Sequence, residues 1–169
     1  MDHSAARKVF EEIQARPYGL SIAYNAPANN CYFKGVELLQ RLGVLGYAVR
    51  GRVGDTSWDA AIVPKHIMDL LPPDIKTTHF FVEAMIDGEW RALDPSLQPS
   101  LGKLGFAIGS WDNGKHCFPI TKLYTQEESI AYQAEWFNEE KSRDFFERGA
   151  ACWRALNAWF QEMAIKTKD

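Results

Sequence analysis

A two-residue turn between two alternating segments constrains the fold of this chain most strongly. Asp87-Gly88 has the favoured chemistry of a tight β-hairpin turn, and it separates segments 78–86 and 89–94. In the first segment apolar residues alternate with the others, which is typical of a strand with one buried face. The sequence therefore predicts an antiparallel hairpin. The residues expected to face a core are Phe80, Val82, Ala84 and Ile86.

The patterns on both sides of this hairpin indicate an α+β fold. Helices are expected over 5–15, 31–42, 63–71 and most of 126–163, with a break near Asn138. Further strands are expected over 47–53, 104–111 and 117–122, the last two forming a second hairpin. No repeat or linker divides the chain, so one domain is expected over 1–169. Its core would span about 29–123 and its C-terminal helices about 126–165.

Composition narrows the class of protein. A chain of 169 residues with 46% hydrophobic residues can bury a core, and a net charge of −3 without a basic stripe argues against nucleic-acid binding. No apolar run could span a bilayer, and the N-terminal residues lack the apolar core of a signal peptide. Three widely spaced cysteines then indicate free thiols in a reducing compartment. We therefore expect a cytoplasmic protein that does not bind membranes.

The register of the hairpin brings two polar residues together. A two-residue turn pairs Ile86 with Glu89. Counting outward places Phe81 opposite Asp94. His79 lies two residues farther along, so it is a diagonal neighbour of Asp94 on the same face, roughly 7–8 Å away at the backbone. An aspartate at this distance can accept a hydrogen bond from the imidazole, fix its tautomer and stabilise its charged form.

Cys31 is placed where a reactive thiol would be activated. It begins the predicted helix 31–42, directly after Asn30, a plausible N-cap. A helix N-terminus and an adjacent imidazolium both favour the thiolate. Gly35, one turn on, would let the strand that carries His79 approach closely. We expect Cys31 to be the nucleophile, His79 the base and Asp94 the orienting group. The alternative is a structural cysteine, a strand-end histidine and an Asp-Pro turn.

Two stretches resemble the core of the transglutaminase-like superfamily. The first runs from Asn30-Cys31-Tyr32-Phe33-Lys34 to Val53. The second joins His79-Phe80-Phe81-Val82-Glu83 to Gly88-Glu89-Trp90-Arg91-Ala92-Leu93-Asp94-Pro95-Ser96. The resemblance covers roughly 29–97. It implies a papain-like α+β core in which a nucleophilic cysteine at a helix N-terminus packs on an antiparallel sheet. It assigns Cys31, His79 and Asp94 the roles of nucleophile, general base and acid, and orienting residue.

Members of this superfamily include crosslinking acyltransferases, peptidases, amidases and inactive proteins. The expected function is therefore a cysteine-dependent hydrolase or acyltransferase that acts on a protein, peptide or small amide through a thioester. Hydrolysis is favoured slightly, because no second substrate site is evident. A catalytically silent binding or scaffold module is the first alternative. A coenzyme-linked N-acetyltransferase-like enzyme is the second.

Secondary candidates complete the predicted site. Tyr24, Asn25 and Asn30 are candidate donors to an oxyanion. Trp58 and Trp111 are candidate walls of the substrate cleft, and partly buried packing is at least as good an expectation for both. No cofactor is expected, and no metal, since His116-Cys117 lacks the spacing of a zinc site.

The last predicted helix carries an apolar stripe. Packing on the sheet is the default role for it, and a homodimer interface is the functional alternative. The stripe consists of Phe145, Cys152, Trp153, Leu156, Trp159, Phe160 and Met163.

Overall fold

The computed structural model describes residues 2–24, 26–136 and 138–167. A four-stranded antiparallel sheet has the order β3-β2-β1-β4. Its strands are β1 (Val49–Thr56), β2 (Thr77–Ile86), β3 (Glu89–Leu93) and β4 (Ile120–Leu123). The helices are α1 (Ser4–Gln14), α2 (Cys31–Val44), α3 (Lys65–Met68), η1 (Pro99–Leu104, a 3-10 helix), α4 (Gln126–Trp136) and α5 (Glu139–Lys166). The fold is therefore mixed, with a C-terminal helix, as the sequence predicts.

The central hairpin forms in the expected register. Asp87 and Gly88 both have positive φ, +52° and +89°, which is what a tight hairpin turn with the twist of its strands requires. Ile86 pairs with Glu89, and the pairing continues to Val82 and Leu93. The four residues predicted to face a core are all at most 5% exposed. The alternation of the sequence was sufficient to identify this buried face.

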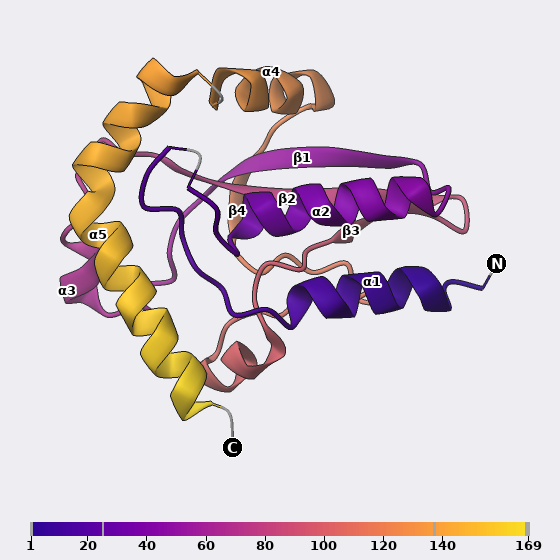
Figure 1. Ribbon diagram of the computed structural model, residues 1–169, viewed down its shortest axis with the longest axis horizontal. Helices are drawn as coiled ribbons and strands as arrows, with labels where there is room; N and C mark the ends of the chain where they lie inside the picture. Colours follow the sequence, from indigo (N-terminus) through magenta and orange to yellow (C-terminus); the bar gives the residue numbers. More distant parts are fainter. Residues whose placement is uncertain (1, 25, 137, 168–169) are drawn as a thin grey trace.

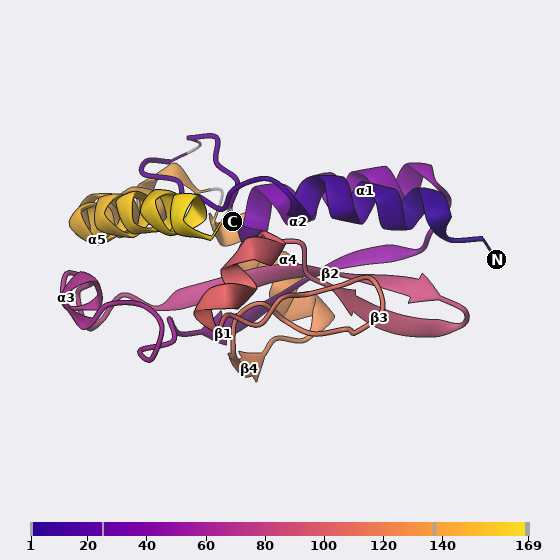
Figure 2. The ribbon, with the colours of Figure 1, turned by 90° about the horizontal axis from the view of Figure 1, so that it is seen from below.

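The buried apolar side chains form two separate hydrophobic cores. In the first, α1 and α2 lie side by side and cover one face of the sheet (Figures 1 and 2). Phe10 of α1, Leu38 of α2 and Val82 of β2 are buried together in this core. The second core lies under α5, which runs along one edge of the molecule (Figure 1). There Trp153 and Phe160 pack among residues from loops, α3 and η1.

The apolar stripe of α5 is largely covered by its own chain. Cys152, Trp153, Leu156 and Phe160 are at most 2% exposed. They pack in the second core rather than on the sheet. The expectation that the stripe is covered by its own chain is confirmed, but the expectation that the sheet covers it is wrong. Because these side chains are already covered, they do not form an open apolar surface. Among the helices described, none is both long and apolar enough to cross a membrane.

The predicted second hairpin does not form. Residues 99–104 make the helix η1, 105–119 are irregular, and β4 pairs with β1 instead. Contacts with distant residues explain this difference. The backbone at Gly109 lies so close to Asp94 that an added Cβ would be 2.3 Å from its carbonyl oxygen. Gln14 Nε2 donates to Gly109 O at 2.6 Å. These long-range contacts wrap the segment around Asp94, and local alternation does not encode them.

Gly35 sets the distance between α2 and the sheet. A Cβ at this position would lie 2.6 Å from two ring atoms of Phe80, and a Cβ at Gly51 of β1 would lie 2.7 Å from two atoms on the opposite edge of the same ring. The Phe80 ring therefore lies between two glycines. The close approach expected at Gly35 is real, but the neighbour is the ring of the residue after His79 rather than the strand backbone.

Gly35→Ala is expected to destabilise the protein by about 1–3 kcal/mol, because the new methyl group would force the ring of Phe80 out of its place between Gly35 and Gly51. Gly43→Ala in the same helix is the matched control. Its nearest neighbour would be 3.9 Å away, so the better helix propensity of alanine should stabilise the protein by about 0.5–1 kcal/mol. Urea unfolding measures both variants. Equal effects at the two glycines would contradict the role of Gly35 as a spacer.

Candidate active site

His79 and Asp94 form a buried pair at the end of the hairpin. His79 Nε2 lies 2.6 Å from Asp94 Oδ2, and the two side chains are 1% and 0% exposed. His79 is near the start of β2, and Asp94 directly follows β3. The register derived from the two-residue turn thus brings together the two side chains that the sequence pairs.

Asp94 is held by four hydrogen bonds. Oδ2 accepts from the backbone N–H of Cys117 at 2.6 Å as well as from His79. Oδ1 accepts from the backbone N–H of Ser96 at 3.1 Å and from its hydroxyl at 2.5 Å. Both oxygens are therefore fully occupied by donors, so the carboxylate is fixed in one orientation.

These contacts determine the charges of the pair. Burial acts to lower the pKa of His79, but the Asp94 carboxylate outweighs it and, with a smaller effect from Cys31, raises that pKa to about 10. Burial would likewise raise the pKa of Asp94, but the His79 ring, the Cys117 amide and the Ser96 hydroxyl hold it well below its ordinary range. At neutral pH the pair is an imidazolium and a carboxylate.

Cys31 is the first residue of α2 and half-buried. The side chain of Asn30 caps the helix, because its Oδ1 accepts from the backbone N–H of Phe33 at 3.0 Å. Next to Cys31, the Nδ1 atom of His79 is buried. This atom makes no hydrogen bond of normal geometry among the described residues, although Cys31 is near enough to act on the charge of the ring. Nδ1 is thus the ring atom left for the thiol.

Cys31 and His79 open onto one cavity of about 140 Å³. Its wall includes the loop before α2, the first turn of α2, β1 with the loop after it, the start of β2, and the helices α4 and α5. Aromatic side chains from all these segments line it, among them Tyr18, Trp136 and Phe145. The C-terminal helices, which the sequence treats as packing elements, therefore form part of the site.

The candidates for the oxyanion donor and the cleft wall differ in their positions relative to the cavity. Tyr24 and Trp58 line the cavity. Asn30 also lines it, but its Oδ1 is used for capping and its Nδ2 donates to Ser21 Oγ at 3.2 Å. Because an amide nitrogen carries two hydrogens, the second hydrogen of Nδ2 keeps Asn30 a candidate donor to an oxyanion. Asn25 lies outside the described residues.

Trp111 lies away from this cavity. It is 3% exposed and belongs to the core between the helices and the sheet. The expectation that it lines the substrate cleft is wrong.

Four residues of the site were not predicted. Ser96 could have been, because an aspartate two residues before it commonly bonds the backbone in an Asx turn. Cys117 and Tyr18 carry no local signal, since each reaches the site through a long-range contact. Lys34 is 1% exposed, and its ammonium group donates to the carbonyls of Gln14, Arg16 and Ser96 at 3.3, 2.6 and 2.9 Å.

The part of the chain that the structure describes holds no group of three or more histidine, cysteine or acidic side chains suited to a metal ion. Comparisons of the chain with protein-family models, with curated proteins and with solved structures gave no match. A function assigned to this protein must therefore follow from the chemistry of Cys31, His79 and Asp94 and from the cavity beside them.

Proposed function

We propose that the protein is a cysteine-dependent hydrolase or acyltransferase with a transglutaminase-like core, acting on an amide, peptide or related acyl bond. The observation that carries the proposal is the 2.6 Å contact between His79 and Asp94 beside Cys31, at the edge of one cavity. Buried charged groups are unfavourable unless they are paired, and pairs that perturb each other beside a cleft are characteristic of catalytic sites.

The first step forms a thioester. With a proton on His79, Cys31 acts as a thiolate and attacks the carbonyl carbon, so that a C–S bond forms. His79 then gives its proton to the leaving amine or alcohol as the C–N or C–O bond breaks. Asp94 stabilises the imidazolium before transfer and keeps Nε2 protonated afterwards. His79 Nδ1 is the atom that moves the proton.

Two groups are suited to stabilise the oxyanion of the tetrahedral intermediate. The backbone N–H of Cys31 is at the helix N-terminus, and Asn30 caps only the amides of later residues. The side chain of Tyr18 lines the cavity and is 5% exposed. Burial, with the nearby Cys31, raises the pKa of Tyr18 well above its usual value, so its O–H remains available as a donor.

The second step resolves the thioester. His79, now neutral, accepts a proton from water or an amine at Nδ1 while that nucleophile attacks the thioester carbon. The C–S bond breaks, and Cys31 and His79 return to their starting charges. We favour water as the acceptor, which makes the enzyme a hydrolase.

Alkylation of Cys31 tests the thiolate directly. With iodoacetamide followed by mass spectrometry, we expect labelling of Cys31 to be at least about tenfold slower in His79→Gln than in the natural protein, because the imidazolium is lost. Cys117 and Cys152 are poor references, since burial raises the pKa of both thiols and also blocks access. The comparison is therefore made at Cys31, between the two proteins.

A control separates loss of the cation from loss of folding. His116→Gln removes a half-buried histidine that packs on Phe81, with ring centroids 4.3 Å apart. It should leave labelling of Cys31 unchanged. If His79→Gln folds, as judged by circular dichroism, and labels Cys31 as fast as the natural protein, the catalytic proposal fails and a silent scaffold module becomes the better account.

A further inference from the structure

The cavity beside Cys31 carries information about the substrate. Among the described residues that line it, none is an aspartate, glutamate, lysine or arginine. Two charged groups lie at its edge in the proposed mechanism: His79, whose charge Asp94 already neutralises, and the Cys31 thiolate, which is the attacking group. An ionic substrate group in this cavity would lose its hydration without gaining a partner, which is strongly unfavourable. The cavity is therefore suited to an uncharged group.

Several polar side chains of the wall bond to each other or to the backbone, whereas Trp58 Nε1 is buried without a hydrogen-bond partner among the described residues. Thr78 Oγ1 and the Tyr132 hydroxyl are 2.9 Å apart. Thr77 Oγ1 donates to the Thr56 carbonyl at 2.8 Å, and Gln133 Nε2 donates to the carbonyl of its own helix at Ser129, 3.0 Å away. Since these groups have partners, the surface they present to a ligand is mainly apolar.

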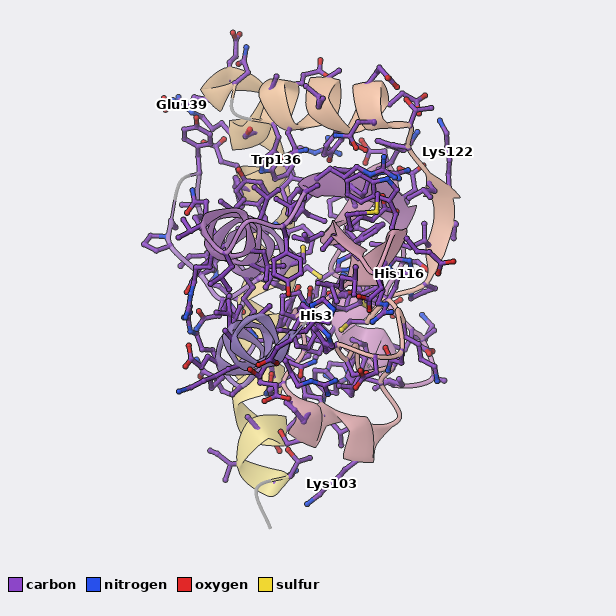
Figure 3. All side chains as sticks on the ribbon, turned by 90° about the vertical axis from the view of Figure 1, so that its right-hand side faces the viewer. His3, Lys103, His116, Lys122, Trp136 and Glu139 are labelled. Atoms are coloured by element: carbon purple, nitrogen blue, oxygen red, sulfur yellow. The ribbon has the colours of Figure 1, made fainter. Side chains whose placement is uncertain are left out.

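Aromatic rings dominate the part of the wall formed by α4 and α5. Trp136 at the end of α4 (labelled in Figure 3) packs edge-to-face on Phe145, with ring centroids 4.8 Å apart. Phe145 in turn stacks on Trp153 at 5.0 Å. Rings arranged in this way offer both edges and faces, the two surfaces that another aromatic ring prefers to contact.

The size of the cavity limits the group further. Its volume is about 140 Å³, and an engineered apolar cavity of about 150 Å³ holds one benzene molecule. We infer that the acyl group transferred to Cys31 carries a single uncharged aromatic ring, which occupies this cavity between α4, α5 and the catalytic pair. This inference rests on the proposed function, because it names the substrate class of the same site.

Binding to Cys31→Ala tests the inference without turnover. By isothermal titration calorimetry, phenylacetamide should bind at least about tenfold more tightly than acetamide, since an apolar pocket discriminates by roughly this factor. A p-carboxyphenylacetamide probe should bind no better than acetamide. Equal affinities for the three amides, or tightest binding of the carboxylated one, would overturn the inference.

Variants locate the binding site. Trp136→Ala should reduce the preference for phenylacetamide at least about threefold, and Trp136→Phe should restore most of it. Trp90→Ala is the matched control, because Trp90 is 41% exposed on β3 and does not line the cavity. A preference that is the same in all these proteins would place the ring elsewhere and overturn the inference.

Acylation of the natural protein distinguishes the two proposals. The S-ethyl thioesters of acetic and phenylacetic acid share one small leaving group, ethanethiolate, which takes the proton of His79. Intact-mass spectrometry should show Cys31 acylated at least about tenfold faster by the phenylacetyl ester. Equal rates would overturn the aromatic preference and leave the proposed function standing. If neither ester acylates Cys31 while Cys31→Ala still prefers phenylacetamide, the proposed function fails and the binding site stands.

Discussion

Asp94→Asn is expected to slow acylation of Cys31 by about 10³–10⁴-fold. It should also lower the free energy of unfolding by about 3–5 kcal/mol, because it leaves buried donors without an acceptor. The reason is geometric. Each carboxylate oxygen accepts from a backbone N–H, that of Cys117 at one oxygen and that of Ser96 at the other. The amide nitrogen of asparagine would therefore face an N–H donor in either orientation.

The matched control is Asp112→Asn. Asp112 also pairs with a cation, Arg7 at 2.6 Å, but its side chain is 62% exposed. Exposed pairs contribute about 0–1 kcal/mol, so this substitution should change neither acylation nor stability appreciably. Acylation kinetics with a thioester and urea unfolding provide the two readouts. An Asp94→Asn protein that acylates as fast as the natural one would refute the orienting role of Asp94.

The pH dependence of the stability difference identifies the ion pair. The pKa of His79 rises from 6.5 to about 10 on folding, so its contribution is complete below pH 6.5 and is lost as the pH rises toward 10. The pKa of Asp94 is lowered, so its contribution is present above pH 3.8 and is lost in more acidic solution. The difference between the natural protein and Asp94→Asn should therefore be largest between about pH 4 and 6.5. A difference that does not change up to pH 10 would exclude the pair as its source.

The hairpin explains why half of this site could be predicted from the sequence. His79 and Asp94 belong to one supersecondary unit, whose register follows from the turn at Asp87-Gly88. Local rules of pairing and alternation were therefore sufficient to bring the two side chains together. Cys31 was predicted in the same way, because an N-cap followed by an apolar period defines the start of a helix.

The other half of the site depends on contacts that no local rule describes. The Cys117 amide reaches Asp94 across 23 positions, on a segment whose alternation suggests a strand. Tyr18 belongs to a loop that carries no periodic signal, yet it is 5% exposed in the wall of the cavity. In both places tertiary contacts outweighed the local preference. The cavity wall formed by α4 and α5 also could not be predicted, because an apolar stripe on a helix does not indicate which surface the helix will cover.

Lys34→Met is expected to destabilise the protein by about 2–4 kcal/mol and to slow acylation of Cys31. Burial lowers the pKa of Lys34 from 10.5 to about 8, a penalty of about 3 kcal/mol that methionine would remove. Its ammonium group donates to three carbonyls, those of Gln14, Arg16 and Ser96. Leaving them unpaired costs about 1–3 kcal/mol each. The free energy lost with these hydrogen bonds exceeds the burial penalty that methionine removes. Their loss also detaches the segment that holds Asp94 from the helix that begins at Cys31.

The sign of the pH effect distinguishes the loss of a buried titrating ammonium group from a simple packing defect. Between about pH 8 and 10.5 the unfolded chain binds the proton of Lys34 more tightly than the folded protein, so Lys34 makes stability rise with pH in this window. His79 acts in the opposite direction there. Lys34→Met removes the rising contribution alone, so its stability should fall more steeply over this window than that of the natural protein. Gln40→Met, at an exposed position of the same helix, should leave the slope and the acylation rate unchanged. Parallel pH profiles for the natural protein and Lys34→Met would show that burial does not lower the pKa of Lys34.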